Sequence, residues 1–128
     1  MTEQKEQALA RLEKLFQNSD TGMTRDKYFT MMEQLGQEPK DNEIPPDWED
    51  LPEIIVYAAN TFNMLGDRVA SEIGYMGKDY TNLPYYIELY AIEDIEFFLE
   101  ILSFLDSRAI KKSSEQMKKE YDKLKRKK

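Results

Sequence analysis

The segment 94-DIEFFLEILSFLDSRAI-110 sets the architecture of this chain, because apolar residues occur on nearly every side of it when it is read as a helix. A helix that is apolar all round is normally enclosed, so we expect residues 95–105 to be surrounded by protein. No glycine or proline occurs from Asp94 to the last residue. Nothing local therefore stops a helix of about three to four dozen residues.

The C-terminal part of this predicted helix is strongly basic. Residues 107–128 hold ten Lys or Arg against three acidic residues, a net charge of +7, which leaves −14 for residues 1–106. Its apolar residues thin to a narrow stripe of Met117, Tyr121 and Leu124. Such an end either docks on a partner or extends into solvent. Binding to nucleic acid is disfavoured, because the acidic remainder of the chain would repel the same polymer.

Helical spacing also recurs near the N-terminus. Apolar residues at intervals of three and four predict a first helix, which the turn residues 18–22 would close. A second helix is predicted over about residues 25–35, with Thr24 as its N-cap and Gly36 just beyond its last apolar residue. Both helices would be amphipathic, with one face available for packing.

A loop and a third helix follow. Residues 36–50 hold three of the five prolines and many acidic groups, which favours an extended loop. We interpret Trp48 as an anchor that pins this loop. Asp50 and Glu53 have the spacing of a capping box and predict the start of the third helix, which Gly66 would end in a left-handed turn.

Residues 73–86, IGYMGKDYTNLPYY, differ from the rest of the chain in holding two glycines and four tyrosines. A phosphate-binding loop needs four residues between its glycines and a Ser or Thr after the lysine, whereas here Asp79 follows Lys78. We interpret the segment as a tight connector whose tyrosines fill the seam between helices. It leads into a short helix that Thr81 or Asn82 would cap, with Pro84 in the first turn.

No alternating run bounded by turn residues indicates a β-strand. The sequence therefore predicts an all-α protein, a compact helical domain of four to five helices with a long, basic C-terminal helix. Residues 1–110 would form a single helical domain, and residues 111–128 a basic helical extension.

The composition argues against an enzyme. The chain has no cysteine and no histidine, which removes thiolate nucleophiles, the commonest zinc ligands and the commonest general base near neutral pH. Acidic residues near predicted helix starts are accounted for by the helix dipole. These are Asp47, Asp50, Glu93 and Asp94. We expect no catalytic site, no metal and no cofactor. No stretch reaches the roughly 18 unbroken apolar residues of a membrane span, so we expect a cytoplasmic protein without a membrane partner.

Three consecutive patterns resemble small proteins from the tail-gene region of tailed bacteriophages. In these proteins a Trp-led helix precedes a loop of the form Gly-x-Asp-Tyr-x-x-Leu and then a helix ending in an acidic-x-x-Ala motif. The matching residues here are Trp48, then Gly77, Asp79, Tyr80 and Leu83, then Asp106 and Ala109. The resemblance covers roughly residues 45–112. Phe62 stands nearest to the second tryptophan usual in the first helix, and the basic tail has no counterpart.

The resemblance implies a non-enzymatic morphogenesis protein of the infected host cell, similar to tail-assembly chaperones that bind a helical client such as the tape-measure protein. A second copy of this chain is a further candidate partner. The alternatives are a structural neck or tail component of the virion, and a nucleic-acid-binding or anti-defence accessory acting through the basic tail. The expected partner-binding residues are aromatic or methionine: Tyr28, Met31, Met32, Trp48, Tyr75, Tyr80, Tyr85, Met117 and Tyr121.

Overall fold

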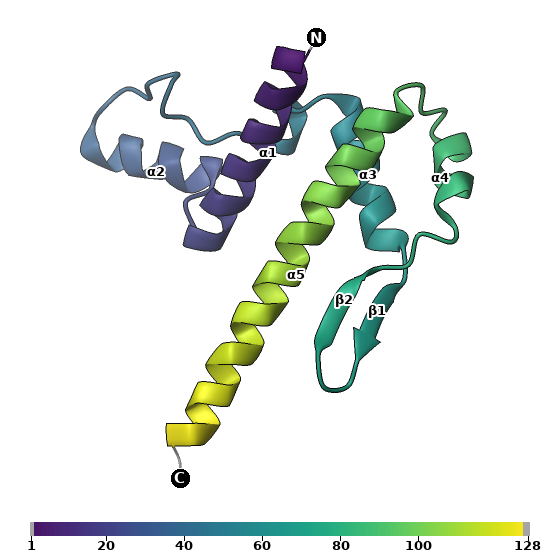
Figure 1. The fold of residues 1–128 in the computed structure, drawn as a ribbon. Helices are drawn as coiled ribbons and strands as arrows, with labels where there is room; N and C mark the ends of the chain where they lie inside the picture. Colours follow the sequence, from purple (N-terminus) through teal and green to yellow (C-terminus); the bar gives the residue numbers. More distant parts are fainter. Residues whose placement is uncertain (1, 127–128) are drawn as a thin grey trace. The chain divides into compact units, whose positions relative to one another are not determined.

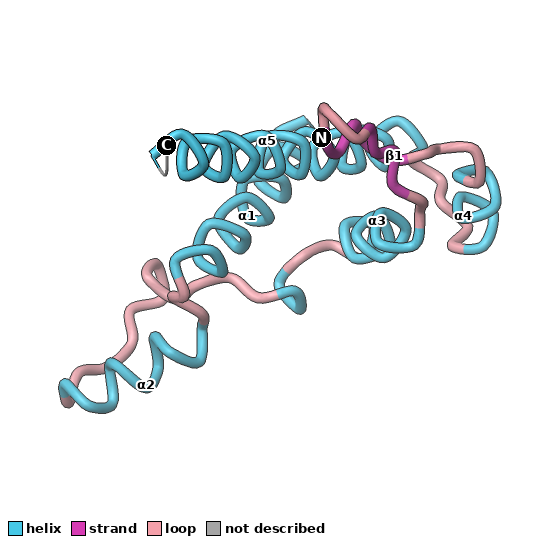
Figure 2. The backbone as a smooth tube through the Cα atoms, turned by 90° about the horizontal axis from the view of Figure 1, so that it is seen from below, coloured by secondary structure: helices cyan, strands magenta, loops and turns pink. Residues whose placement is uncertain are grey.

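The computed structural model describes residues 2–126, and in that range it contains five α-helices, one short 3-10 helix and one two-stranded antiparallel sheet (Figure 1). The predicted all-α class is confirmed in its main features, because helices dominate and the last helix is by far the longest. The two strands occupy only the segment between α3 and α4 (Figure 2). The chain divides into two units, one ending at Glu53 and one beginning at Ile54.

The first unit contains helices α1 (Thr2–Thr21) and α2 (Arg25–Leu35) and the 3-10 helix η1 (Trp48–Asp50). The predicted bounds and caps of α2 are confirmed. Thr24 accepts a hydrogen bond from the Lys27 amide at 3.3 Å. Gly36 ends the helix with a left-handed φ of 66°, and its amide bonds back to the last turn.

Replacing Thr24 with alanine should lower the free energy of unfolding by about 1 kcal/mol, because the first turn of α2 loses its side-chain acceptor. Chemical denaturation followed by circular dichroism measures the change. Thr30→Ala is the matched control, since the Thr30 hydroxyl donates to the Asp26 carbonyl on the exposed side of the same helix. An equal loss in both variants would contradict a capping role for Thr24.

Arg25 ties the acidic loop to the start of α2. Its Nε donates to the Pro45 carbonyl at 3.0 Å, and its guanidinium pairs with Glu49 at 2.9 Å and with Asp50. The loop also reaches α1, where the Trp48 ring meets Phe16 edge-on with 6.0 Å between centroids. These contacts agree with the interpretation of Trp48 as an anchor.

The predicted capping box of Asp50 and Glu53 is wrong. The box instead closes η1: the Asp47 carboxylate accepts from the Trp48 amide at 2.8 Å, and the Asp50 carboxylate accepts from the Asp47 amide at 3.0 Å. The Asp47 amide and then Arg25 hold the pKa of Asp50 below its usual value. Asp50 therefore caps η1, the element that precedes α3, and does not cap α3 as expected.

The second unit begins within α3 and contains one β-hairpin and two further helices. Its elements are α3 (Glu53–Met64), β1 (Asp67–Ala70), β2 (Gly74–Lys78), α4 (Leu83–Leu89) and α5 (Ile95–Arg126). The short helix α4 lies where the sequence predicts it, with Pro84 in the first turn, although the Asn82 side chain makes no capping bond. Asp94 caps α5, because its carboxylate accepts from the Phe97 amide at 3.1 Å.

The expectation that the chain contains no strand is wrong. β1 and β2 form an antiparallel pair in which Asp67 faces Lys78 and Val69 faces Tyr75, with one irregularity in the register. Gly66 does not adopt the left-handed conformation expected of it. Its carbonyl instead accepts a hydrogen bond from the Asp79 amide at 2.8 Å, so the chain passes from α3 directly into the hairpin.

Helices α3, α4 and α5 each contribute buried side chains. In α5 these are Phe97, Phe98, Ile101, Leu102 and Leu105. The expectation that residues 95–105 are surrounded on all sides is wrong for one edge, because Ile95 and Leu99 are exposed. Tyr57 of α3 stacks on Tyr90 at the end of α4, with 4.6 Å between ring centroids. The predicted boundary at residue 110 lies within α5, which continues without a break.

Candidate functional site

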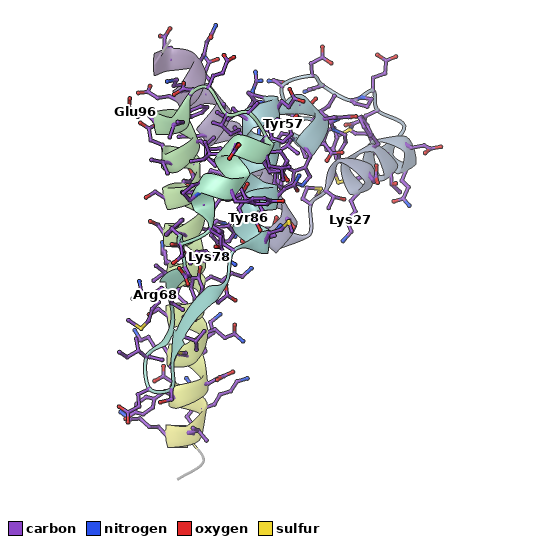
Figure 3. All side chains as sticks on the ribbon, turned by 90° about the vertical axis from the view of Figure 1, so that its right-hand side faces the viewer. Lys27, Tyr57, Arg68, Lys78, Tyr86 and Glu96 are labelled. Carbon is purple, nitrogen blue, oxygen red and sulfur yellow. The ribbon has the colours of Figure 1, made fainter. Side chains whose placement is uncertain are left out.

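The hairpin is fastened to α5 by one carboxylate. Asp106 accepts hydrogen bonds from the Tyr75 hydroxyl at 2.6 Å, the Tyr80 hydroxyl at 2.7 Å and the Lys78 amide at 3.2 Å. We call Tyr75, Gly77, Lys78, Tyr80 and Asp106 the Asp106 clasp. Figure 3 places Lys78 beside the middle of α5, where β2 runs along the helix.

Glycines in β2 allow this close approach. Tyr75 and Gly77, two residues apart on β2, both meet Asp106. Gly77 has a φ of +117°, and a Cβ atom there would lie 3.1 Å from the Asp106 carboxylate. Gly74 has a φ of +88°, and a Cβ atom there would lie 2.4 Å from the sulfur of Met117. Side chains at these two positions would push β2 away from the helix.

Lys78 closes the base of the hairpin with its side chain while its amide serves the clasp. Its Nζ pairs with Asp67 at 2.6 Å, donates to the Leu65 carbonyl at 3.2 Å and lies 4.6 Å from the centroid of the Phe62 ring. The positive charge of the ammonium is thus stabilised by the Asp67 carboxylate, the Leu65 carbonyl and the face of the Phe62 ring. This set of contacts joins the end of α3 to both strands.

The charges of the clasp are stabilised by its hydrogen bonds. Burial alone would raise the pKa of Asp106, but the donors Tyr75, Tyr80 and the Lys78 amide outweigh it and hold that pKa below its usual value. Burial, and then the hydrogen bond to Asp106, raise the pKa of both tyrosines above the ordinary value of 10.0. The clasp therefore consists of one carboxylate and two neutral phenols around neutral pH.

This arrangement suits a structural role, in which the clasp holds the hairpin against α5. Both carboxylate oxygens of Asp106 accept hydrogen bonds, and both phenol protons are donated to it. Within residues 2–126, no three acidic side chains gather closely enough to hold a metal ion. In the same range, none of the helices combines the length and the apolar character that crossing a membrane requires. The clasp fixes the position of the hairpin and of the surfaces beside it.

Tyr75 and Tyr80 should ionise above the ordinary tyrosine pKa of 10.0. Because folding raises these two pKa values, the protonated phenols contribute fully to the stability of the fold below pH 10. This contribution is lost as the pH rises through the higher folded-state pKa. We expect a late step in the spectrophotometric phenolate titration, which the Tyr75→Phe/Tyr80→Phe variant lacks. Tyr85→Phe is the control, because that ring is exposed. Loss of the late step in the control alone would contradict the assignment.

The nine partner-binding residues expected from the sequence are spread over the chain. Tyr75 and Tyr80 meet in the clasp, and Met117 lies against Gly74. Tyr85 is exposed and meets Tyr86 edge-on, and Tyr121 is exposed beneath the ammonium of Lys125.

The other four lie in the first unit. Tyr28 and Met32 are buried, Met31 is half-buried, and Trp48 is partly exposed beside Phe16. The Tyr28 hydroxyl accepts from the Lys40 amide at 3.3 Å and lies 3.4 Å from Glu43. Tyr28 and Met32 therefore serve packing and do not offer a free surface, which corrects the expectation for these two residues.

Asp106 and Lys78 organise the site but were not among the residues expected to form it. A signal existed in the sequence: Asp106 lies midway between the apolar residues Leu102 and Ile110 on one face of α5, at intervals of four residues. A carboxylate on such a face needs hydrogen-bond donors from a neighbouring segment.

Comparison with protein-family models, with curated proteins and with solved structures gives no match to this chain. The resemblance of residues 45–112 to phage tail-region proteins therefore stays a prediction.

Proposed function

We propose that this protein is a non-enzymatic phage morphogenesis protein, most like a tail-assembly chaperone, that binds a helical client such as the tape-measure protein. The observation that carries the proposal is the Asp106 clasp. Gly77, Tyr80 and Asp106 belong to two separate sequence patterns of the resemblance, and they meet in one hydrogen-bonded cluster. A single structural purpose would account for the presence of both patterns in the same chain.

The hairpin supplies a surface for the client. Val69, Ile73 and Met76 are large apolar residues of the hairpin that remain exposed, at 68%, 65% and 42%. A two-stranded hairpin is only marginally stable in isolation, so the clasp is what keeps these side chains in fixed positions. They offer apolar contacts to the stripe of an amphipathic helix, and methionine adapts to an irregular partner.

The charge of the chain suits this activity. Residues 1–106 carry a net charge of −14, which opposes aggregation of the protein with an apolar client bound to it. The client surface proposed here lies on the hairpin because Tyr28 and Met32, expected from the sequence to contact the client, are buried.

Affinity purification of the tagged protein from infected cells tests the proposal. We expect tape-measure protein to be recovered, and we expect the Val69→Ser/Ile73→Ser/Met76→Ser variant to recover about tenfold less, since three apolar contacts are removed. Leu35→Ser is the control, because Leu35 is also an exposed apolar residue, at 60%, but lies in the other unit. Recovery of no tail protein by the unaltered chain would refute the proposal.

Mass spectrometry of purified particles separates the chaperone from a neck or tail component of the virion. A chaperone acts during assembly and leaves, so we expect the protein to be abundant in infected cells and scarce in particles. A stoichiometric presence in particles would favour the structural component.

A further inference from the structure

An open groove runs along α5 next to the Asp106 clasp. Tyr80 and Leu83, from the segment that follows the hairpin, line one side of it, and α5 lines it from Leu99 to Ile110. Eleven helical residues rise about 16 Å, or three turns. The volume of the groove is about 400 Å³. None of the described residues that line it belongs to the hairpin (67–78), so the hairpin leaves the groove open.

The groove exposes apolar side chains that its own chain leaves uncovered. Leu99 and Ile110, at its two ends, are exposed at 44% and 39%, and Tyr80 at 37%. Leu83 and Leu102, which also line it, are buried. An apolar groove three turns long suits the apolar stripe of an amphipathic helix, which is a recurrent mode of protein recognition.

Two glutamates border the Leu99 end of the groove. Glu96 lies seven residues before Ser103, and Glu100 lies seven residues before Ser107. Seven residues make almost two full turns, so each glutamate shares a line along α5 with a serine that lines the groove. Both glutamates are exposed. Figure 3 shows Glu96 at the outer edge of α5, on the side away from α4 and therefore on the open flank of the groove.

These two glutamates lack a cation to pair with in the described part of the chain. No Lys or Arg occurs three or four residues from either one, and within residues 2–126 neither forms an ion pair. Glu96 and Glu100 are themselves four residues apart, a spacing at which like charges on a helix repel each other. Lys111 lies at the other end of the groove, beside Ile110 and about 16 Å along the helix from Glu100. A cation supplied by a partner would relieve the repulsion at the acidic end.

We propose that this groove binds an amphipathic helix of another protein that carries Lys or Arg beside one end of its apolar stripe. The stripe would cover Leu99 and Ile110, and the basic residues would face Glu96 and Glu100. Charge complementarity selects this partner. A helix flanked by carboxylates, or a nucleic acid, would be repelled by the acidic end of the groove and by the net charge of −14 on residues 1–106.

The groove is separate from the hairpin surface proposed for the client. Val69, Ile73 and Met76 are not among the residues that line it, so this inference does not rest on the proposed function. The clasp nevertheless shapes the groove, because Tyr80 is held on Asp106 by a 2.7 Å hydrogen bond and both residues line it. The clasp therefore fixes one side of the groove as well as the hairpin.

Fluorescence anisotropy with two labelled model peptides tests the proposal on the full chain. Both peptides are about 14 residues long, or four helical turns, and share a leucine stripe at intervals of three and four. One carries lysine and the other glutamate at the flanking positions. We expect the lysine peptide to bind at least about tenfold more tightly. No binding of the lysine peptide, or equal affinity for both peptides, would overturn the proposal.

Substitutions then locate the binding site. Leu99→Ser and Glu100→Lys should each weaken binding of the lysine peptide about tenfold, because one removes an apolar contact and the other reverses a charge at the groove. The Glu96→Lys/Glu100→Lys variant should prefer the glutamate peptide. Glu115→Lys is the matched control, since it makes the same change in net charge on an exposed residue of α5 about 22 Å further along. An equal loss in Glu115→Lys would indicate nonspecific attraction and would contradict the assigned site.

Sedimentation equilibrium examines a second copy of the chain as the other occupant. We expect no dimer that depends on Leu99, and a dimer that Leu99→Ser dissociates would show that a second copy fills the groove. Because Leu99 is exposed, this variant should keep the circular dichroism of the unaltered chain. The Val69→Ser/Ile73→Ser/Met76→Ser variant should still bind the lysine peptide, and loss of binding there would place the peptide on the hairpin instead.

Discussion

Replacing Asp106 with alanine is expected to lower the free energy of unfolding by about 3 kcal/mol, because a hydrogen-bonded carboxylate that joins three donors is lost. The Tyr75 and Tyr80 hydroxyls and the Lys78 amide would each lose their acceptor. Urea denaturation measures the stability. Hydrogen exchange should show faster exchange across residues 67–78, because the hairpin is no longer held on α5.

The control for this variant is Asp122→Ala, which removes an exposed aspartate from the same helix. It should change stability by less than about 0.5 kcal/mol, as is usual for surface substitutions. The lowered pKa of Asp106 fixes the sign of the pH dependence: the contribution is present above the ordinary carboxyl pKa of 3.8 and is lost as the pH falls through the lower folded-state value. Unaltered exchange in the hairpin of Asp106→Ala would show that the clasp does not hold it.

Replacing Gly77 with alanine is expected to cost about 2 kcal/mol, because the backbone there has a positive φ that an L-amino acid with a Cβ atom adopts only with strain. The added Cβ atom would also lie 3.1 Å from a carboxylate oxygen of Asp106, so it would press on the clasp itself. We expect lower stability in urea denaturation and a late tyrosine titration step that moves to lower pH, since the hydrogen bonds to Asp106 are, after burial, the second cause of the raised phenol pKa values.

Gly66→Ala is the matched control for Gly77→Ala. Gly66 precedes β1 at the same open end of the hairpin, has no positive φ, and an added Cβ atom there would meet nothing within 4 Å. Alanine there should be neutral or slightly stabilising, because it reduces the freedom of the unfolded chain. A larger loss at residue 66 than at residue 77 would contradict the explanation from backbone strain.

The helices could be predicted because their signals are local. Thr24 and Gly36 define α2 to the residue, since each cap acts on amides or carbonyls within the same turn. The hairpin could not be predicted in this way. Its strands are four and five residues long, two glycines interrupt the second, and its fastening to α5 depends on Asp106, 28 residues beyond Lys78.

The candidate site was predictable only in part. The tyrosine-rich segment was recognised as unusual, and two of its tyrosines, Tyr75 and Tyr80, do meet in one place. Their shared partner was not predicted, because periodicity places Asp106 on a face of α5 but does not say which segment covers that face. The exposure of Leu99 was missed for a related reason: an apolar residue on a crowded helix is not necessarily covered by its own chain.

The fastening of the hairpin at a single carboxylate also determines how the protein would respond to mechanical load. α5 has 32 residues and is about 48 Å long, which makes it a stiff lever compared with the short hairpin. Tension applied at the hairpin tip would concentrate on the bonds to Asp106. These would yield before the buried side chains of α5 are disturbed, so the hairpin would detach from α5 while the helix stays intact.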